Sequence, residues 1–268
     1  MDDSMAVMDP SFDPRFQPVM LFYPDGTNVS FSVNDITTVH VQNIQQAVVF
    51  ATQIGACGII AILMLLLTRS EKRKTFLFGC NLAALLTVVI RSVFQISNLI
   101  GPWNETYTFF AYDYSDISLS ARYESIAGAV FALLLQMLVQ LSLILQVRVV
   151  FAGNAHLNVA ITLLTTFISL LSVGFYFVVV VENARAMMVM GVYSIGWVYA
   201  TAKASFAASI SIFSLIFVLK LGLAIRKRRI LGLKSFGPMQ IIFAMGCQTM
   251  ILPGKFSFHP PIQLRCRF

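Results

Sequence analysis

A dense cluster of cations interrupts a strongly apolar part of this 268-residue chain. Apolar runs long enough to cross a bilayer lie on both sides of it, so the positive-inside rule places this loop in the cytoplasm. Ammonium and guanidinium groups at this density bind acidic surfaces, which leaves two readings open: anionic lipid headgroups or an acidic protein partner. The candidate contact residues of the loop are Arg226, Lys227, Arg228, Arg229, Leu231, Gly232, Leu233 and Lys234.

The composition predicts a polytopic membrane protein. Hydrophobic residues make up 57% of the chain and charged residues 12%, and the mean hydropathy is +0.78. Since hydrocarbon offers the backbone no hydrogen-bond partners, the apolar windows must be helices, and the fold class is an all-α membrane helix bundle. The expected spans are Gln45–Leu67, Phe76–Ile100, Ile126–Phe151, Leu157–Val181, Tyr199–Ile225 and a weaker sixth from Gly237 towards Phe258.

Charge asymmetry predicts the orientation of the bundle. Six aspartates but only Arg15 precede the first span, whereas the loop that follows this span carries four cations and Glu71. The amino terminus is therefore expected outside the cell, in a multi-pass plasma-membrane protein. The sequence pI of about 9.4 sums two faces of opposite sign, so it does not imply nucleic-acid binding. Two glycosylation motifs, at Asn28 and Asn104, fall on the external side.

Polar side chains inside the spans are candidate ligand or packing groups. Arg91, in the outer half of the second span, could line a ligand cavity or extend to the outer interface. Gln136 shares one helix face with Gln140, and both need hydrogen-bond partners. Lys203 could meet a carboxylate of a ligand or reach water. We group Arg91, Gln136 and Lys203 as a candidate ligand cavity.

Small residues spaced four apart mark one face of the first span. Ala51 and Gly55 let another backbone approach closely, as in ordinary packing within one bundle. The segment from Glu182 to Tyr193, in contrast, has a strand-like composition near its middle. We expect it to form a small external hairpin.

Three sequence stretches resemble the fungal mating-pheromone receptors of alpha-factor type, the class D seven-helix G-protein-coupled receptors. They are AIRKRRILGLKSF (Ala224–Phe236), MGCQTMILP (Met245–Pro253) and LQVRVVFAG (Leu145–Gly153). The resemblance implies a secreted peptide pheromone as ligand and a heterotrimeric G protein that touches the basic loop. It also implies a polar switch and hinge made of Asn81, Gln146, Gln248 and Pro253, and a dimer contact at Ala51 and Gly55.

The resemblance stops after Pro253. The ending GKFSFHPPIQLRCRF holds cations and paired prolines, so we expect five full spans plus a truncated sixth. Translated intron sequence and a genuine short isoform are the two explanations, and whether this form signals stays open. The expected division is an extracellular segment (1–44), a helix bundle (45–253) and an aberrant tail (254–268).

Two other classes of membrane protein fit the sequence less well. A secondary transporter or channel usually places acids at the membrane midplane, but every Asp and Glu lies outside the expected spans. An enzyme needs a buried acid–base pair or a metal cluster, and the three histidines also lie outside the confident spans. We therefore expect no catalysis and no cofactor, with membrane lipid, the pheromone and the G protein as partners.

Overall fold

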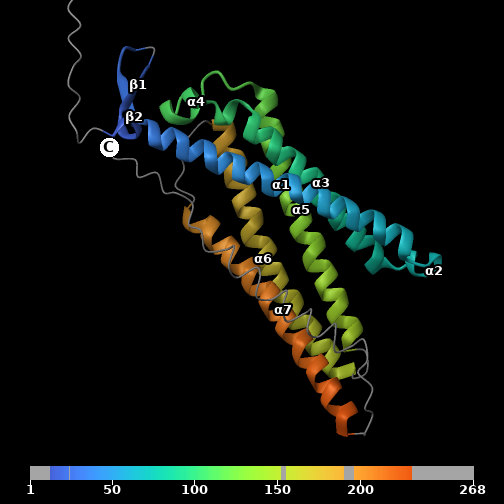
Figure 1. Cartoon of the computed structure of the whole chain (residues 1–268). Coiled ribbons are helices and arrows are strands. Elements are labelled where there is room, and N and C mark those ends of the chain that lie inside the picture. The colour runs from blue at the N-terminus through green and yellow to red at the C-terminus, as the bar shows by residue number, and fades with distance from the viewer. Residues whose placement is uncertain (1–12, 24, 152–154, 190–195, 231–268) are drawn as a thin grey trace, which may run out of the picture. The chain divides into compact units, whose positions relative to one another are not determined.

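The computed structural model describes residues 13–23, 25–151, 155–189 and 196–230 (Figure 1). The chain divides into two units. The first comprises residues 1–135 and 182–193, and the second comprises residues 136–181 and 194–268.

The described part of the first unit begins with a short 3-10 helix, η1 (Pro14–Phe16), and a two-stranded antiparallel sheet. Strand β1 (Pro18–Phe22) pairs with β2 (Asn28–Ser32) so that Val19 lies opposite Phe31. This hairpin was not predicted from the sequence. It adds a small β element to a fold whose membrane part is the expected helix bundle.

An aspartate-centred turn joins the two strands. The Oδ1 atom of Asp25 accepts hydrogen bonds from the backbone nitrogen of Thr27 at 2.9 Å and from its Oγ1 at 2.7 Å. Gly26 adopts a positive φ of 83°, which glycine tolerates without a steric penalty. The Thr27 hydroxyl, followed by its backbone N–H, lowers the pKa of Asp25. These hydrogen bonds are therefore retained above the ordinary pKa of an aspartate and weaken only as the pH falls below it.

The hairpin leads directly into the first long helix, α1 (Val33–Leu67). Ser32 and Asp35 form a capping box, in which the Ser32 hydroxyl accepts from the Asp35 N–H and the Asp35 carboxylate accepts from the Ser32 N–H. Such a cap is worth about 1 kcal/mol. It explains why the helix begins at Val33, whereas the apolar window predicted a start at Gln45.

Helix α1 packs against α3 (Phe76–Ile100), and the short α2 (Ser70–Arg73) lies between them in sequence. The bounds of α3 are those predicted. After α3 the chain forms η2 (Pro102–Asn104) and α4 (Thr106–Ala111). Tyr112 then ends α4 in the left-handed region at φ 55°.

The hairpin docks on α4. The Tyr23 hydroxyl donates to the backbone carbonyl of Ala111 at 2.8 Å, and the ring centroids of Phe31 and Phe110 lie 4.8 Å apart. Phe110 is 5% exposed, so this aromatic pair forms a small core of its own. The leader and the loop after α3 thus form one folded cap on the first unit.

Three more long helices follow: α5 (Leu119–Val150), α6 (Ala155–Val189) and α7 (Gly196–Ile230). Helices α6 and α7 extend beyond both ends of their predicted spans, whereas α5 begins before the predicted Ile126 and ends at Val150, just before the predicted Phe151. The expected external hairpin at Glu182–Tyr193 is wrong for the described residues, because α6 continues as helix to Val189. Ala, Met and Glu in this segment favour helix, and they outweigh its few valines.

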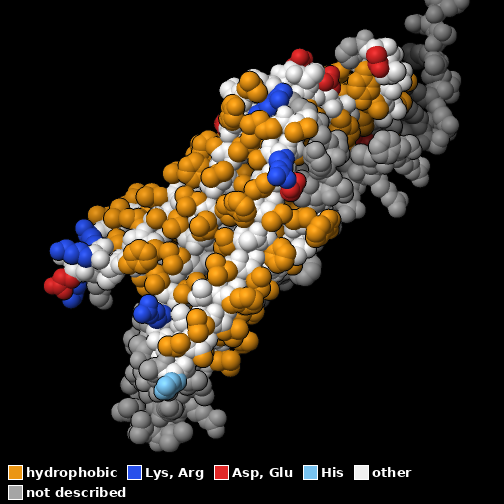
Figure 2. Space-filling view, turned by 180° about the vertical axis from the view of Figure 1, so that it is seen from behind, with side chains coloured by type: hydrophobic (Ala, Val, Ile, Leu, Met, Phe, Trp, Pro, Cys, Tyr) orange, Lys and Arg blue, Asp and Glu red, His pale blue; other side chains and the backbone are white. Residues whose placement is uncertain are grey.

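Five helices of the described chain are long and apolar enough to cross a membrane, which agrees with the five full spans predicted. Their surfaces are apolar as well: Leu163 is 66% exposed and Phe167 is 61% exposed on α6. Figure 2 shows hydrophobic side chains scattered over much of the described surface in view. Exposed apolar surface of this extent suits contact with lipid tails. The sixth predicted span lies outside the described residues.

Gly128 permits the close packing of α3 against α5 within the first unit. A Cβ atom at this position would lie 3.3 Å from the Cβ of Phe94, whose ring stacks on Phe131 at 5.4 Å. We predict that Gly128→Val lowers the free energy of unfolding by about 1–3 kcal/mol, because the added methyl groups have no space. Thermal unfolding of the detergent-solubilised protein measures this loss.

The matched control is Gly174→Val on α6, where an added Cβ meets nothing within 4 Å. Equal destabilisation by both variants would contradict the packing argument for Gly128.

Candidate functional site

Buried amide and hydroxyl groups join the helices of the second unit. The Nε2 atom of Gln136 on α5 donates to both the carbonyl and the hydroxyl oxygen of Ser172 on α6, each at 3.1 Å. One turn further along α5, the Oε1 atom of Gln140 accepts from the Ser169 hydroxyl at 3.0 Å. Four residues forward along α5, from Gln136 to Gln140, the partner on α6 moves three residues back, from Ser172 to Ser169. The two helices therefore run antiparallel.

Helix α7 joins the same network. The Ser209 hydroxyl also donates to Oε1 of Gln140, at 3.0 Å. We call these residues the amide ladder: Gln136, Gln140, Ser169, Ser172 and Ser209. All of its members are at most 4% exposed. In hydrocarbon such groups have no other partners, so the ladder fixes the register of three helices.

The amide ladder gives Gln136 a role in the packing of α5 against α6. The sequence made Gln136 a candidate for the ligand cavity, and in the structure its amide nitrogen is hydrogen-bonded to Ser172 within the helix packing. Lys203, another cavity candidate, is exposed on α7, and its Nζ lies 4.4 Å from the ring centroid of Tyr199. A cation over an aromatic face at this distance is attractive.

The four candidate switch residues lie in different parts of the chain. Gln146 on α5 donates from Nε2 to the hydroxyl of Ser142 at 3.2 Å, one turn away. Asn81 is half-buried on α3 in the first unit. Their pairing therefore stays a prediction. Gln248 and Pro253 lie outside the described residues.

The carboxyl-terminal end of α5 packs against α7 in the second unit. Phe151, Val147 and Phe213 form a buried apolar cluster, and the Nζ atom of Lys220 lies 4.6 Å from the Phe151 ring centroid. A shallow groove opens beside this cluster. It is lined by Leu143, Gln146, Val147, Phe213, Ser214, Phe217 and Val218.

The first unit has a polar contact of its own between helices. The hydroxyl of Ser92, which is 0% exposed on α3, donates to Oε1 of Gln53 on α1 at 3.2 Å. The adjacent Arg91 is partly exposed, and its Nε atom is buried with no hydrogen-bond partner in the described part of the chain. Arg91 thus remains able to bind a further acceptor.

The small-residue face of α1 is open. Ala51 and Gly55 are both exposed, and an added Cβ at Gly55 would meet nothing within 4 Å. Which backbone approaches this face, in the bundle or in a second copy, stays a prediction.

The two glycosylation motifs have different surroundings. Asn28 is exposed on the hairpin. Asn104 is half-buried just after α3, its Nδ2 donates to the carbonyl of Asn98 at 2.9 Å, and its Oδ1 accepts from Asn43 at 3.5 Å. A glycan would be attached to that same Nδ2 atom.

The four consecutive cations belong to a helix. The sequence predicted that Arg226, Lys227, Arg228 and Arg229 lie in a loop after a span ending at Ile225. That boundary is wrong, because α7 continues to Ile230, and all four have high or moderate helix propensity. Leu231, Gly232, Leu233 and Lys234 lie outside the described residues.

Sequence reasoning missed the three serines of the ladder. Ser169, Ser172 and Ser209 are small hydroxyl residues inside apolar runs, where their usual role is a hydrogen bond to their own helix. The only available signal was the pair of glutamines four residues apart, which required partners without saying which.

These observations define a class: a multi-pass helical membrane protein with polar joints between its helices. Comparison with known proteins identifies the family. Residues 12–260 match the family model described as fungal pheromone mating factor STE2 GPCR. The chain belongs to this family, which consists of signalling receptors rather than enzymes.

Curated relatives agree with that assignment. The chain is 29% identical over 234 residues to the pheromone alpha factor receptor of Lachancea kluyveri, with 86% of this chain covered. It is 27% identical over 257 residues to the pheromone alpha factor receptor of Saccharomyces cerevisiae, with 91% covered. The pheromone P-factor receptor of Schizosaccharomyces pombe is 26% identical over 209 residues, with 75% of this chain and 60% of that receptor covered. The chain spans 54% and 57% of the two alpha factor receptors.

The contrast between the two motifs generates a prediction. We expect Asn28 to carry the glycan and Asn104 to carry none, because Asn104 lies next to the end of α3 and its amide is already bonded. Asn28→Gln should increase the electrophoretic mobility of the protein from yeast membranes, and Asn104→Gln should not. A mobility change with Asn104→Gln alone would contradict this assignment.

Proposed function

We propose that this chain is a plasma-membrane receptor for a secreted peptide pheromone and that it acts through a heterotrimeric G protein. The observation that carries the proposal is the family match over residues 12–260, on a chain with five membrane-length helices. Relatives named as pheromone receptors support the ligand class. The alternative of a transporter or channel has no comparable support.

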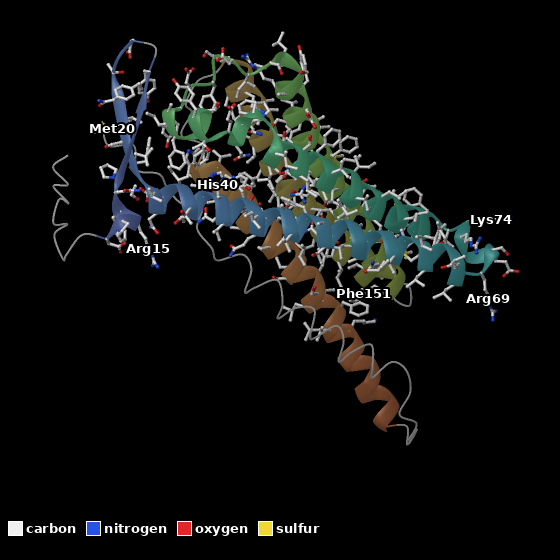
Figure 3. The ribbon with its side chains drawn as sticks, turned by 45° about the horizontal axis from the view of Figure 1, so that its top comes forward. Arg15, Met20, His40, Arg69, Lys74 and Phe151 are labelled. Carbon is white, nitrogen blue, oxygen red and sulfur yellow. The ribbon has the colours of Figure 1, made fainter. Side chains whose placement is uncertain are left out.

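The charge distribution of the first unit supports an external amino terminus. Figure 3 shows Met20 and His40 towards one end of α1, with Arg69 and Lys74 at the other end. Aspartates cluster at the cap end: desolvation, followed by the negative charge of Asp113, raises the pKa of Tyr107. The positive-inside rule then assigns the Arg69 end to the cytoplasm.

The basic end of α7 supports coupling to an acidic partner. A helix that runs to Ile230 presents Arg226, Lys227, Arg228 and Arg229 on a rigid extension of the span, which loses less conformational entropy on binding than a loop would. In this proposal the peptide binds at the outer end and shifts the populations of two packings. The inner ends of the helices then engage the G protein. Homodimerisation through Ala51 and Gly55, with lipid on the other apolar faces, is part of the same proposal.

The first test concerns the basic helix end. In cells that lack their own receptor and express this chain, synthetic alpha-type peptides should activate the G protein. Replacing Arg226, Lys227, Arg228 and Arg229 by alanine should abolish activation but leave binding of labelled peptide unchanged, because the cations lie on the opposite side of the membrane.

The matched control replaces Arg226, Arg228 and Arg229 by lysine, which keeps the charge and should retain most of the activation. No response of the unmodified receptor to any fungal pheromone peptide would overturn the receptor proposal itself.

The second test separates the two roles of Arg91. If its guanidinium binds a peptide carboxylate, Arg91→Lys should weaken peptide binding about tenfold or more, since lysine lacks the planar pair of donors. If Arg91 only extends to the interface, Arg91→Lys should bind peptide normally. We expect the first result, because the buried Nε atom has no partner among the described residues. Saturation binding on intact cells measures it.

A further inference from the structure

Cations gather where α1 ends and α3 begins. The sequence from Arg69 to Lys74 holds four cations and one carboxylate, that of Glu71. Arg69, Arg73 and Lys74 are all exposed, and none of them forms an ion pair with a carboxylate within the part of the chain that the structure describes. We call these three residues the basic patch. Figure 3 shows Arg69 and Lys74 at the same end of α1. The charge of the patch is therefore available to a partner outside the chain.

Arg73 is held in place by hydrogen bonds to the end of α1. Its backbone N–H donates to the carbonyl of Arg69 at 3.2 Å, and its Nε donates to the carbonyl of Thr68 at 2.8 Å. Because these bonds use only Nε of the guanidinium, its two terminal nitrogens are left to donate as a planar pair. Such a pair matches two oxygens of one phosphate group, and a side chain that is already ordered loses less entropy on binding.

Apolar side chains on both sides of the basic patch indicate its depth in the membrane. Leu66 and Leu67 at the end of α1 are 71% and 79% exposed, and Phe76 at the start of α3 is 67% exposed. Surface of this kind suits contact with lipid tails. Arg69 follows Leu67 by two residues and Lys74 precedes Phe76 by two, so each cation lies within about 7 Å of a lipid-facing residue along the backbone. The patch is therefore at the level of the lipid headgroups.

Two kinds of partner carry the opposite charge: an acidic protein surface and an anionic lipid headgroup. The neighbouring apolar side chains favour the lipid, because one molecule then supplies both a tail for the apolar surface and an anion for the cations. Three unpaired cations exceed the single net charge of phosphatidylserine. They suit a headgroup with phosphate monoesters, each of which carries a charge of about −1.5 to −2 at neutral pH.

We propose that the basic patch binds the headgroup of a phosphoinositide in the inner leaflet. The terminal nitrogens of Arg73 bind one phosphate group, and Arg69 and Lys74 add positive charge from the two helix ends. A headgroup bound in this way joins the end of α1 to the start of α3, since Arg69 follows the first helix and Lys74 precedes the second. The proposal rests on the cytoplasmic orientation proposed above for this loop, but not on the identity of the peptide ligand.

Binding of a fluorescent short-chain phosphatidylinositol bisphosphate to the full chain in neutral detergent tests the proposal. Arg73→Gln should weaken binding about tenfold or more, because it removes the charge and the pair of donors together. Arg73→Lys keeps the charge and should also weaken binding, since lysine lacks the planar pair. Binding by Arg73→Lys that equals that of the unmodified chain would overturn the proposal.

The matched control is Arg148→Gln, which removes an exposed cation from the last turn of α5, outside the basic patch. This variant should bind the lipid almost as the unmodified chain does. Equal losses from Arg148→Gln and Arg73→Gln would indicate diffuse attraction to any cation and overturn the proposal. Displacement of the fluorescent lipid by phosphatidylserine at equal total charge would overturn it as well.

A second variant decides the matter if Arg73→Gln disturbs α2. Arg69→Gln combined with Lys74→Gln leaves both hydrogen bonds of Arg73 in place, and this double variant should also weaken binding. Unchanged binding by the double variant, or no binding by the unmodified chain, would contradict the proposal. The assay contains no peptide, G protein or sealed membrane, so failure of the receptor proposal would leave its result unaffected.

Discussion

Hydrocarbon supplies no hydrogen-bond partners, and this constraint governs the rest of the structure. It requires the five long spans to be helices, and it requires Gln136, Gln140 and Ser92 to find partners on neighbouring helices. Burying apolar side chains between helices gains little free energy, because lipid tails contact them as favourably as protein does. Packing between the helices therefore depends on close approach at small residues such as Gly128 and on these few polar joints.

Outside the membrane the chain is stabilised by small clusters of packed side chains and by helix caps. The aromatic contact of Phe31 with Phe110 and the hydrogen bond from Tyr23 to Ala111 fold the leader onto the loop after α3. Water competes for every polar group there, so apolar burial contributes more than hydrogen bonds do. The capping box at Ser32 connects this cap to α1, and through α1 to the span that carries Gln53.

The hydropathy of the sequence predicted the membrane-spanning parts of the helices, but not the helical extensions outside them or the polar contacts between them. The bounds of α3 were predicted to the residue, because Lys74 and Pro102 lie just beyond its two apolar ends. The extensions of α1 to Val33 and of α7 to Ile230 were missed, because helix outside the membrane depends on caps and propensity rather than on apolar length. The partners of Gln140 could not be predicted at all. These partners depend on how α6 and α7 are rotated about their own axes, and the sequence around Gln140 does not indicate that rotation.

The continuity of α7 relates these features to function. Ser209 is held by Gln140 deep in the second unit, and the same unbroken helix extends to Ile230 with four cations near its end. A helix without a break transmits rotation or translation along its whole length, whereas a loop after Ile225 would absorb it. A rotation or shift of α7 at Ser209 would therefore also move the turns that contain those cations. In this chain the polar joint at Ser209 and the four consecutive cations belong to one continuous helix.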